Sequence, residues 1–254
     1  MSASQPQAPV ALVTGASRGI GQALALGFAD AGYDLVLMDL PQTGRELRQT
    51  AEMIGLRNRR AWLYTLDISR RAEIDAAVAQ ALADAGQIDV LINNAGVLKP
   101  SLLQDLDEQT WDTHFDVNVK GVLMMCQAVV PQMRARKAGR VINIASIAGR
   151  QGVPTQGHYA ATKSAVITLT RVLAQEAGMD GVTVNAICPG IILTEMGRNN
   201  LGSEDAIRHW ENVTALKRLG APEDVVGPAL FFASAQSAFV TGQALNVCGG
   251  IYFH

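Results

Sequence analysis

Tyr159 and Lys163 lie four residues apart and form the pair of side chains best suited to move a proton. Residues 158–178 favour a helix, and positions i and i+4 of a helix share one face. An ammonium group beside a phenol stabilises the phenolate, so we expect Lys163 to lower the pKa of Tyr159 from about 10. Such a phenol can exchange a proton with an alcohol or ketone oxygen near neutral pH. The alternative for an isolated pair at this spacing is a solvated helix face.

Polar residues between the strand-like segment 140–146 and this helix are candidates to hold a substrate. Ser146 ends the segment, where a hydroxyl can orient a substrate oxygen without ionising. Gln151, Gln156 and His158 follow and offer polar contacts. Helix capping is the alternative role for Ser146 and His158.

Asn118 is a polar residue between Val117 and Val119, inside a helix that we expect over residues 107–136. Asparagine is intrinsically unfavourable in the middle of a helix because its amide competes for backbone hydrogen bonds. We therefore expect the Asn118 amide to hold a water molecule or a backbone group.

The segment TGASRGIG (14–21) places glycines at positions 15, 19 and 21, directly after an apolar run and before a helical segment. Glycines allow a sharp turn and a close approach of the backbone, and the N-terminus of the following helix attracts an anion. The segment therefore predicts a turn that binds the pyrophosphate of a dinucleotide. Its G-x-x-x-G-x-G spacing matches the commoner G-x-G-x-x-G fingerprint only loosely.

Asp39 ends the second apolar segment, 18 residues after Gly21. A carboxylate near this offset binds the ribose hydroxyls of the dinucleotide and repels a 2′-phosphate. Asp39 therefore favours NAD over NADP. Arg18 is the opposing feature, because its guanidinium could pair with a 2′-phosphate.

Apolar segments alternate with helical segments along the rest of the chain. This order predicts one α/β domain over residues 10–254, a doubly wound Rossmann-type fold whose seven-stranded parallel sheet has helices on both faces. A polar tail, residues 1–9, precedes it. The segment 191–217 lacks a clear period and is our candidate substrate lid, with Leu193, Met196, Leu201 and Trp210 as pocket residues. The expected strands are 10–15, 34–39, 61–67, 89–96, 140–146, 182–190 and 244–250, and the expected helices are 21–32, 46–55, 72–86, 107–136, 158–178 and 222–234.

Composition excludes several classes of protein. The 254-residue chain is 48% hydrophobic and 17% charged with a formal net charge of -2, which excludes disorder and gives no basic surface for nucleic acid. No apolar run reaches the roughly 18 residues needed to span a bilayer, and the N-terminus lacks the features of a secretory signal, so we expect a cytoplasmic protein that binds no membrane. The spacing of the cysteines and histidines predicts neither a disulfide framework nor a metal site. The low charge content favours an oligomer.

Several motifs occur together in a consistent order. They are TGASRGIG (14–21), NNAG (93–96), Asn118, Ser146, YAATK (159–163) and Pro189–Gly190, and Ser146 precedes Tyr159 by 13 positions. In these motifs the chain resembles the short-chain dehydrogenase/reductase family over residues 10–251. The resemblance implies a nicotinamide-dependent enzyme and a homotetramer with the helices 107–136 and 158–178 at one interface. One departure is Cys248, where the family often has an aspartate.

The resemblance also implies roles for individual residues. Tyr159 would be the catalytic acid/base, Lys163 would lower its pKa and bind the nicotinamide ribose, and Ser146 would hold the substrate oxygen. Asn118 would anchor a water molecule in a proton relay. Asp67 would contact the adenine, although a helix-capping role is equally open for it. The residues expected to bind the cofactor are Gly15, Ser17, Arg18, Gly19, Ile20, Gly21, Asp39, Asp67, Ile68, Asn93, Ala95, Gly96, Tyr159, Lys163, Pro189, Ile191, Ile192 and Thr194. The residues expected to contact the substrate are Ser146, Gln151, Gln156, His158, Tyr159 and Met196.

Three functions fit the sequence. The first is an NAD-dependent oxidoreductase that interconverts a secondary alcohol and a ketone, with a polyol or sugar preferred because Gln151, Gln156 and His158 flank the expected site. The second is an NADPH-dependent 3-oxoacyl-(acyl-carrier-protein) reductase, which Arg18 favours. The third is a dinucleotide-sensing protein without catalysis, against which the presence of all four catalytic-type residues argues.

Overall fold

The computed structural model describes residues 8–253, so most of the expected tail 1–9 lies outside the described residues. Within that range the strands form a seven-stranded sheet in the order β3-β2-β1-β4-β5-β6-β7, and each neighbouring pair is parallel. The strands are β1 (Val10–Thr14), β2 (Asp34–Asp39), β3 (Ala61–Thr65), β4 (Val90–Asn93), β5 (Gly139–Ile144), β6 (Val182–Pro189) and β7 (Ala244–Val247). The predicted seven-stranded parallel sheet is confirmed.

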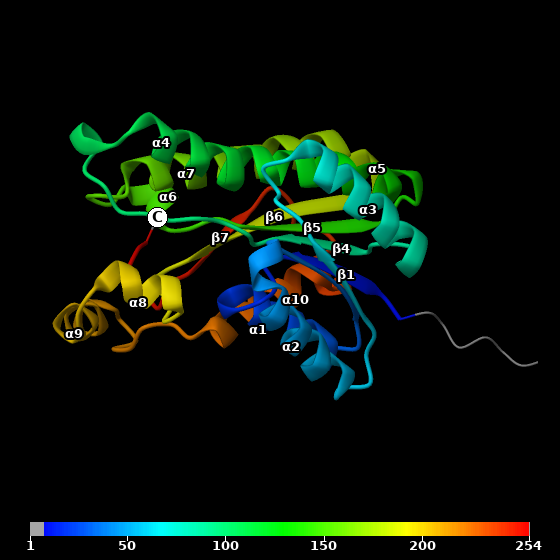
Figure 1. Ribbon diagram of the computed structural model, residues 1–254, viewed down its shortest axis with the longest axis horizontal. Coiled ribbons are helices and arrows are strands. Elements are labelled where there is room, and N and C mark those ends of the chain that lie inside the picture. The colour runs from blue at the N-terminus through cyan, green and yellow to red at the C-terminus, as the bar shows by residue number, and fades with distance from the viewer. Residues whose placement is uncertain (1–7, 254) are drawn as a thin grey trace, which may run out of the picture.

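Helices cover both faces of this sheet (Figure 1). Figure 1 shows α3, α4, α5 and α7 on one face and α1, α2 and α10 on the other. The helices are α1 (Gly19–Asp30), α2 (Gly44–Gly55), α3 (Arg71–Ala85), α4 (Glu108–Phe115), α5 (Val122–Ala135), α6 (Ala148–Gln151), α7 (Gly157–Ala177), α8 (Glu195–Leu201), α9 (Glu204–Val213) and α10 (Val226–Ala233).

Strand β1 shows why the inner strands of the sheet are largely apolar. All five of its residues are buried, and successive side chains of a strand point to opposite faces. Leu12 packs in the core that contains Ile74 and Val166, whereas Val13 packs in the core that contains Leu24. A strand with a core on each face has no position for a solvated side chain.

The helix expected over residues 107–136 is interrupted. A π-helical segment, η3 (Asp116–Gly121), separates α4 from α5. Because each turn of a π-helix contains more residues than an α-helical turn, the interruption changes which side chains face the interior. Asn118 lies in this segment and is fully buried.

The expected irregular lid contains two helices, α8 and α9, which project beyond one end of the sheet in Figure 1. Thr194 caps α8 by accepting a hydrogen bond from the N–H of Gly197, and Ser203 caps α9 through the N–H of Ala206. The prediction of an irregular segment is therefore wrong. The signals that could have found α9 are the Ser203 cap and the acidic residues of its first turn.

The order of strands also locates the site. From β1 the chain extends through β2 to β3 on one side, and β4 then starts the other half of the sheet. At such a switch point the loops after adjacent strands leave in opposite directions and open a crevice at the carboxyl ends of the strands. No helix of the described residues is both long enough and apolar enough to span a membrane.

Candidate active site

The turn between β1 and α1 lies at this crevice and has little room for side chains. Gly15 has a φ of +66°, and a Cβ at this position would lie 2.9 Å from Cα of Ala95. A Cβ at Gly21 would collide with the carbonyl oxygen of Gly15. Helix α1 has neither a side-chain cap nor an acidic residue in its first turn, so no anion of its own opposes the positive end of its dipole. This turn fits the pyrophosphate of a dinucleotide.

Asp39 lines the cleft beside this turn and also fixes its shape. Its Oδ2 accepts hydrogen bonds from the N–H of Ser17 at 2.9 Å and from Ser17 Oγ at 2.5 Å. Its Oδ1 accepts from the N–H of Leu40 at 2.8 Å. A carboxylate has about four acceptor sites, so Oδ1 keeps capacity for a ribose hydroxyl.

Arg18, the residue that would favour NADP, pairs with another part of the chain. Its Nη1 donates to Oε2 of Glu195 in the first turn of α8. Both side chains are largely exposed and both line the cleft. The pair links the glycine-rich turn to α8 and offsets the positive charge beside Asp39.

Ser146, Tyr159 and Lys163 line the same cleft as the glycine-rich turn. Ser146 follows β5, and its Oγ accepts a hydrogen bond from the N–H of Ala148 at 3.1 Å. Tyr159 and Lys163 lie one turn apart on α7. Lys163 Nζ donates to the carbonyl oxygen of Ile144 at 2.8 Å and lies 5.6 Å from the centre of the Tyr159 ring. The structure thus brings the expected proton-transfer residues together.

The pKa of Tyr159 differs from the sequence-based expectation. Burial raises the pKa of the Tyr159 hydroxyl to about 12, a hydrogen bond with Ser146 opposes this rise, and the Cys188 thiolate would add to it. Burial also lowers the pKa of Lys163 to about 8. The prediction that Lys163 lowers the pKa of Tyr159 is therefore wrong for the groups of the chain itself. Loss of water by the buried hydroxyl, rather than the charge of Lys163, determines the direction of the shift.

Asn118 holds the segment that follows β4. Its Oδ1 accepts from the N–H of Val97 at 2.8 Å, and its Nδ2 donates to the carbonyl oxygen of Val97 at 3.0 Å. Nδ2 also donates to Thr162 Oγ1 at 3.1 Å. The amide thus binds a backbone group, one of the two outcomes expected for it. Asn118 does not line the cleft, and its part in a proton relay stays a prediction.

Three residues assigned to the cofactor lie outside the lining of the cleft. Asn93 is buried in the core, where its Nδ2 donates to Asn143 Oδ1 at 2.9 Å. Asp67 accepts from the N–H and the hydroxyl of Ser69, so its carboxylate stabilises a turn before α3. Ile68 is buried against Gly121. Their contacts with a cofactor stay predictions.

Asn94 is a cleft residue that the sequence analysis missed. Its Nδ2 donates to the carbonyl oxygens of Thr14 at 3.0 Å and Gly15 at 3.1 Å. Asn93 and Asn94 are adjacent, and side chains alternate in direction along a strand. The doubled asparagine was the available signal, but only the packing shows which of the two faces the turn.

His158 does not line the cleft. It is fully buried, and its ring faces His114 on α4 rather than the cleft. The prediction that His158 contacts the substrate is therefore wrong, because the side chain at the start of α7 turns toward the neighbouring helix.

The cleft has a volume of about 990 Å³. Gln151, Gln156 and Met196 line it as expected, and Gln156 Nε2 donates to Asn200 Oδ1 of α8 at 3.2 Å. All of the other residues assigned to the cofactor line it as well. Its remaining wall is largely apolar and includes Val97, Leu98, Pro100, Val153, Leu193, Leu201, Ala206 and Trp210.

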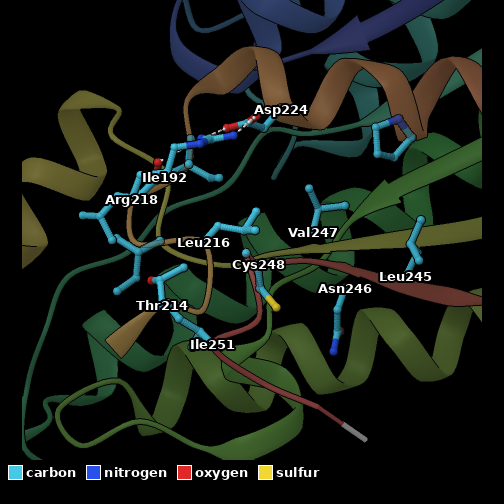
Figure 2. Close-up of a pocket in the computed structure, with 15 residues that line it drawn as sticks. Ile192, Thr214, Leu216, Arg218, Asp224, Leu245, Asn246, Val247, Cys248 and Ile251 are labelled. Atoms are coloured by element: carbon cyan, nitrogen blue, oxygen red, sulfur yellow. Dashed lines mark hydrogen bonds and ion pairs between the residues drawn. The ribbon is translucent and has the colours of Figure 1, made fainter. Parts of the chain in front are cut away.

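A smaller cavity of about 300 Å³ shares Ile191, Ile192 and Ile251 with this cleft. Figure 2 shows its lining, which includes Cys248 and the ion pair of Arg218 with Asp224. The Cys248 thiol lies 3.5 Å from the carbonyl oxygen of Tyr252. A thiol therefore occupies the position of the family's aspartate and contacts the chain's own backbone.

Known proteins share this architecture. Residues 15–252 match the family described as "Enoyl-(Acyl carrier protein) reductase". The chain is 38% identical over 242 residues to the 3-oxoacyl-[acyl-carrier-protein] reductase FabG of Staphylococcus epidermidis, covering 95% of this chain and 98% of that protein. It is 37% identical over 247 residues to the oxidoreductase UcpA of Salmonella typhimurium, covering 94% of this chain and 93% of that protein. The crystal structure of levodione reductase superposes with a TM-score of 0.92 at 29% identity and covers 95% of this chain and 96% of its own.

The chain therefore belongs to the short-chain dehydrogenase/reductase family. It is an oxidoreductase with a Rossmann-type fold, and members of this family bind a nicotinamide dinucleotide.

Proposed function

We propose that the protein interconverts a ketone and a secondary alcohol using NAD(H). The observation that carries this proposal is that Ser146, Tyr159 and Lys163 line the same cleft as the glycine-rich turn and Asp39. The dinucleotide, when bound, supplies or accepts the hydride. The chain must then position the substrate and move one proton.

Tyr159 is the proton donor in the direction of reduction. Because its pKa is raised to about 12, the phenol holds its proton at neutral pH and can give it to a carbonyl oxygen that becomes negative. The Ser146 hydroxyl, on the neighbouring wall, donates a hydrogen bond to the same oxygen. Lys163 is held by the carbonyl oxygen of Ile144 and keeps donor capacity for a ribose hydroxyl.

The proposed cofactor is NAD(H) rather than NADP(H). Asp39 lines the cleft beside the glycine-rich turn, where we expect the ribose of the dinucleotide, and Glu195 engages Arg18, the nearby cation. The Asp39 carboxylate repels a 2′-phosphate, and the pair with Glu195 removes Arg18 as a partner for that phosphate.

The proposed substrate is a 3-oxoacyl thioester or the corresponding 3-hydroxyacyl thioester. The name of the FabG relative supports this class, and the apolar wall formed by Leu193, Leu201 and Trp210 can receive an acyl chain. The polyol or sugar preferred from the sequence gains no specific support from the relatives. Of the polar residues that motivated it, His158 faces away from the cleft.

Initial rates followed by NADH absorbance test this proposal. We expect acetoacetyl-CoA to be reduced with NADH, with a kcat/KM at least about tenfold above that with NADPH, which corresponds to about 1.4 kcal/mol of discrimination. A panel of polyols, sugars and simple ketones should react more slowly. Faster oxidation of a polyol would contradict the substrate class. Binding of NADH without turnover of any compound would instead indicate a dinucleotide sensor.

A further inference from the structure

Two buried histidines lie beside the cleft and take no part in the proton transfer described above. His114 on α4 is 2% exposed and His158 on α7 is 0% exposed. Their rings meet edge to face with centroids 4.3 Å apart. Both rings contact the backbone of Lys99, in the segment that joins β4 to α4.

The hydrogen bonds determine the tautomer of each ring. His114 Nδ1 lies 2.7 Å from the carbonyl oxygen of Thr110, so it must carry the proton, and Nε2 accepts from the N–H of Lys99 at 3.1 Å. His158 Nε2 lies 2.9 Å from the carbonyl oxygen of Lys99, so it must donate. The two rings therefore bind the N–H and the carbonyl of the same residue.

Lys99 lies between two residues of the substrate wall. Leu98 and Pro100 both line the cleft, as does Val97, whose backbone N–H and carbonyl are held by Asn118. Side chains from the helical layer thus hold positions 97 and 99. At the other end of the segment, Thr14 Oγ1 accepts from the N–H groups of Asn94 and Ala95.

We propose that His114 and His158 are positioning residues that hold Lys99 and thereby set the wall formed by residues 97–100 on the substrate side of the cleft. The inference rests on the proposed function and adds to it a determinant of substrate binding. The glycine-rich turn and Thr14 hold the dinucleotide side independently, so the two histidines act on the substrate side.

The cost of burying His158 supports this role. Its Nδ1 is buried without a hydrogen-bond partner, and an unpaired buried polar atom is destabilising. An apolar side chain would avoid that cost but would lose the bond to Lys99. Burial lowers the pKa of His114 and is the largest influence on it. The hydrogen bond to the Thr110 carbonyl raises this pKa, whereas His158 and Lys99 lower it further. The lowered pKa keeps Nε2 free to accept at neutral pH.

Paired substitutions test the role in binding. His114→Leu and His158→Leu remove the bonds to Lys99, whereas His114→Gln and His158→Gln retain an oxygen acceptor or an N–H donor. We expect each Leu variant to raise the KM for the ketone about tenfold, as for loss of one buried hydrogen bond, with the Kd for NADH unchanged within about twofold. The Gln variants should restore most of the loss. Equal weakening of ketone and NADH binding, or no rescue by Gln, would overturn the proposal.

Two measurements need no turnover and separate this inference from the proposed function. In imidazole ¹⁵N spectra of the wild-type protein at pH 7, His114 should be the neutral Nδ1–H tautomer, and the Nε2 of His158 should carry a proton. Hydrogen exchange over residues 97–100 should be about tenfold faster in His114→Leu than in the wild type, and unchanged over residues 14–21. The opposite tautomer at His114, or unchanged exchange at 97–100, would overturn the proposal even if the enzyme is active. If both measurements agree while no ketone is reduced, the proposed function fails and the positioning of Lys99 stands.

Discussion

Tyr159 combines a catalytic position with a hydroxyl that holds its proton tightly. The phenol shares the cleft with Ser146 and Lys163, yet burial raises its pKa to about 12. Replacing Tyr159 with Phe removes the proton donor while keeping the ring. We expect kcat/KM for the ketone to fall by about 10² to 10⁴, the usual contribution of general acid–base catalysis, with NADH affinity retained. Steady-state rates and calorimetric titration with NADH measure the two quantities, and substantial residual turnover would contradict the role of Tyr159.

The raised pKa also predicts how the rate depends on pH. Below a pKa of about 12 the neutral phenol predominates, so reduction should be nearly independent of pH between 6 and 7, below the pKa of about 8 of Lys163. Oxidation of the alcohol requires the phenolate, whose fraction rises about tenfold per pH unit below the pKa. The oxidation rate should therefore rise with pH over that range. Profiles in both directions test this, with Tyr159→Phe as the control whose residual rate should not follow the slope.

Asp39 both shapes the glycine-rich turn and faces the expected ribose. Asp39→Ala should weaken NADH binding about tenfold or more, as for the loss of a hydrogen bond to a charged group, and should relatively favour NADPH. Ser17→Ala is the matched control, because it removes one bond to Asp39 but leaves the carboxylate. In Ser17→Ala the ratio of the NADH affinity to the NADPH affinity should stay as in the wild type. A constant ratio in Asp39→Ala would show that the carboxylate does not distinguish the cofactors.

At the scale of elements, helix α8 adds a contact that the sequence did not indicate. Glu195 in its first turn pairs with Arg18 of the glycine-rich turn. Glu195→Gln should release Arg18 for a 2′-phosphate and strengthen NADPH binding severalfold, since an exposed pair contributes at most about 1 kcal/mol. Fluorescence titration with NADPH and NADH measures the change. The double variant Arg18→Ala/Glu195→Gln should lose the gain, and a gain that persists would assign the effect to another residue.

The elements themselves were largely predictable, with informative exceptions. The inner strands are largely apolar because they are buried on both faces, so a short apolar run between helices was sufficient to locate each of them. The interruption at η3 was not predictable, because an asparagine that is unfavourable in the middle of a helix does not distinguish a π-helical turn from a continuous α-helix. The contacts of Asn118 with Val97 and Thr162 arise only once α7 and the segment after β4 lie beside η3.

At the scale of the whole molecule, we expect the homotetramer that the family resemblance implies. Trp111, Leu123 and Val172 are each at least 40% exposed and lie on α4, α5 and α7, the helical layer on one side of the sheet. Light scattering should return roughly four times the chain mass of 27.0 kDa at micromolar concentration. Val172→Glu should shift the protein toward smaller species, because a charge is costly to bury in an interface. A monomeric wild-type protein would remove this expectation.

The sequence by itself determined which segments form the strands and which residue types line the site. These are seven apolar segments, the glycine-rich turn, Asp39, and the set of Ser146, Tyr159 and Lys163. These features are local or have regular spacing, so residue type and position suffice to identify them. Tertiary structure alone decided which of Asn93 and Asn94 faces the cleft, that His158 turns toward His114, and that burial raises the pKa of Tyr159. Each of these depends on groups far apart in the chain, because side-chain direction and loss of water are properties of the packed molecule.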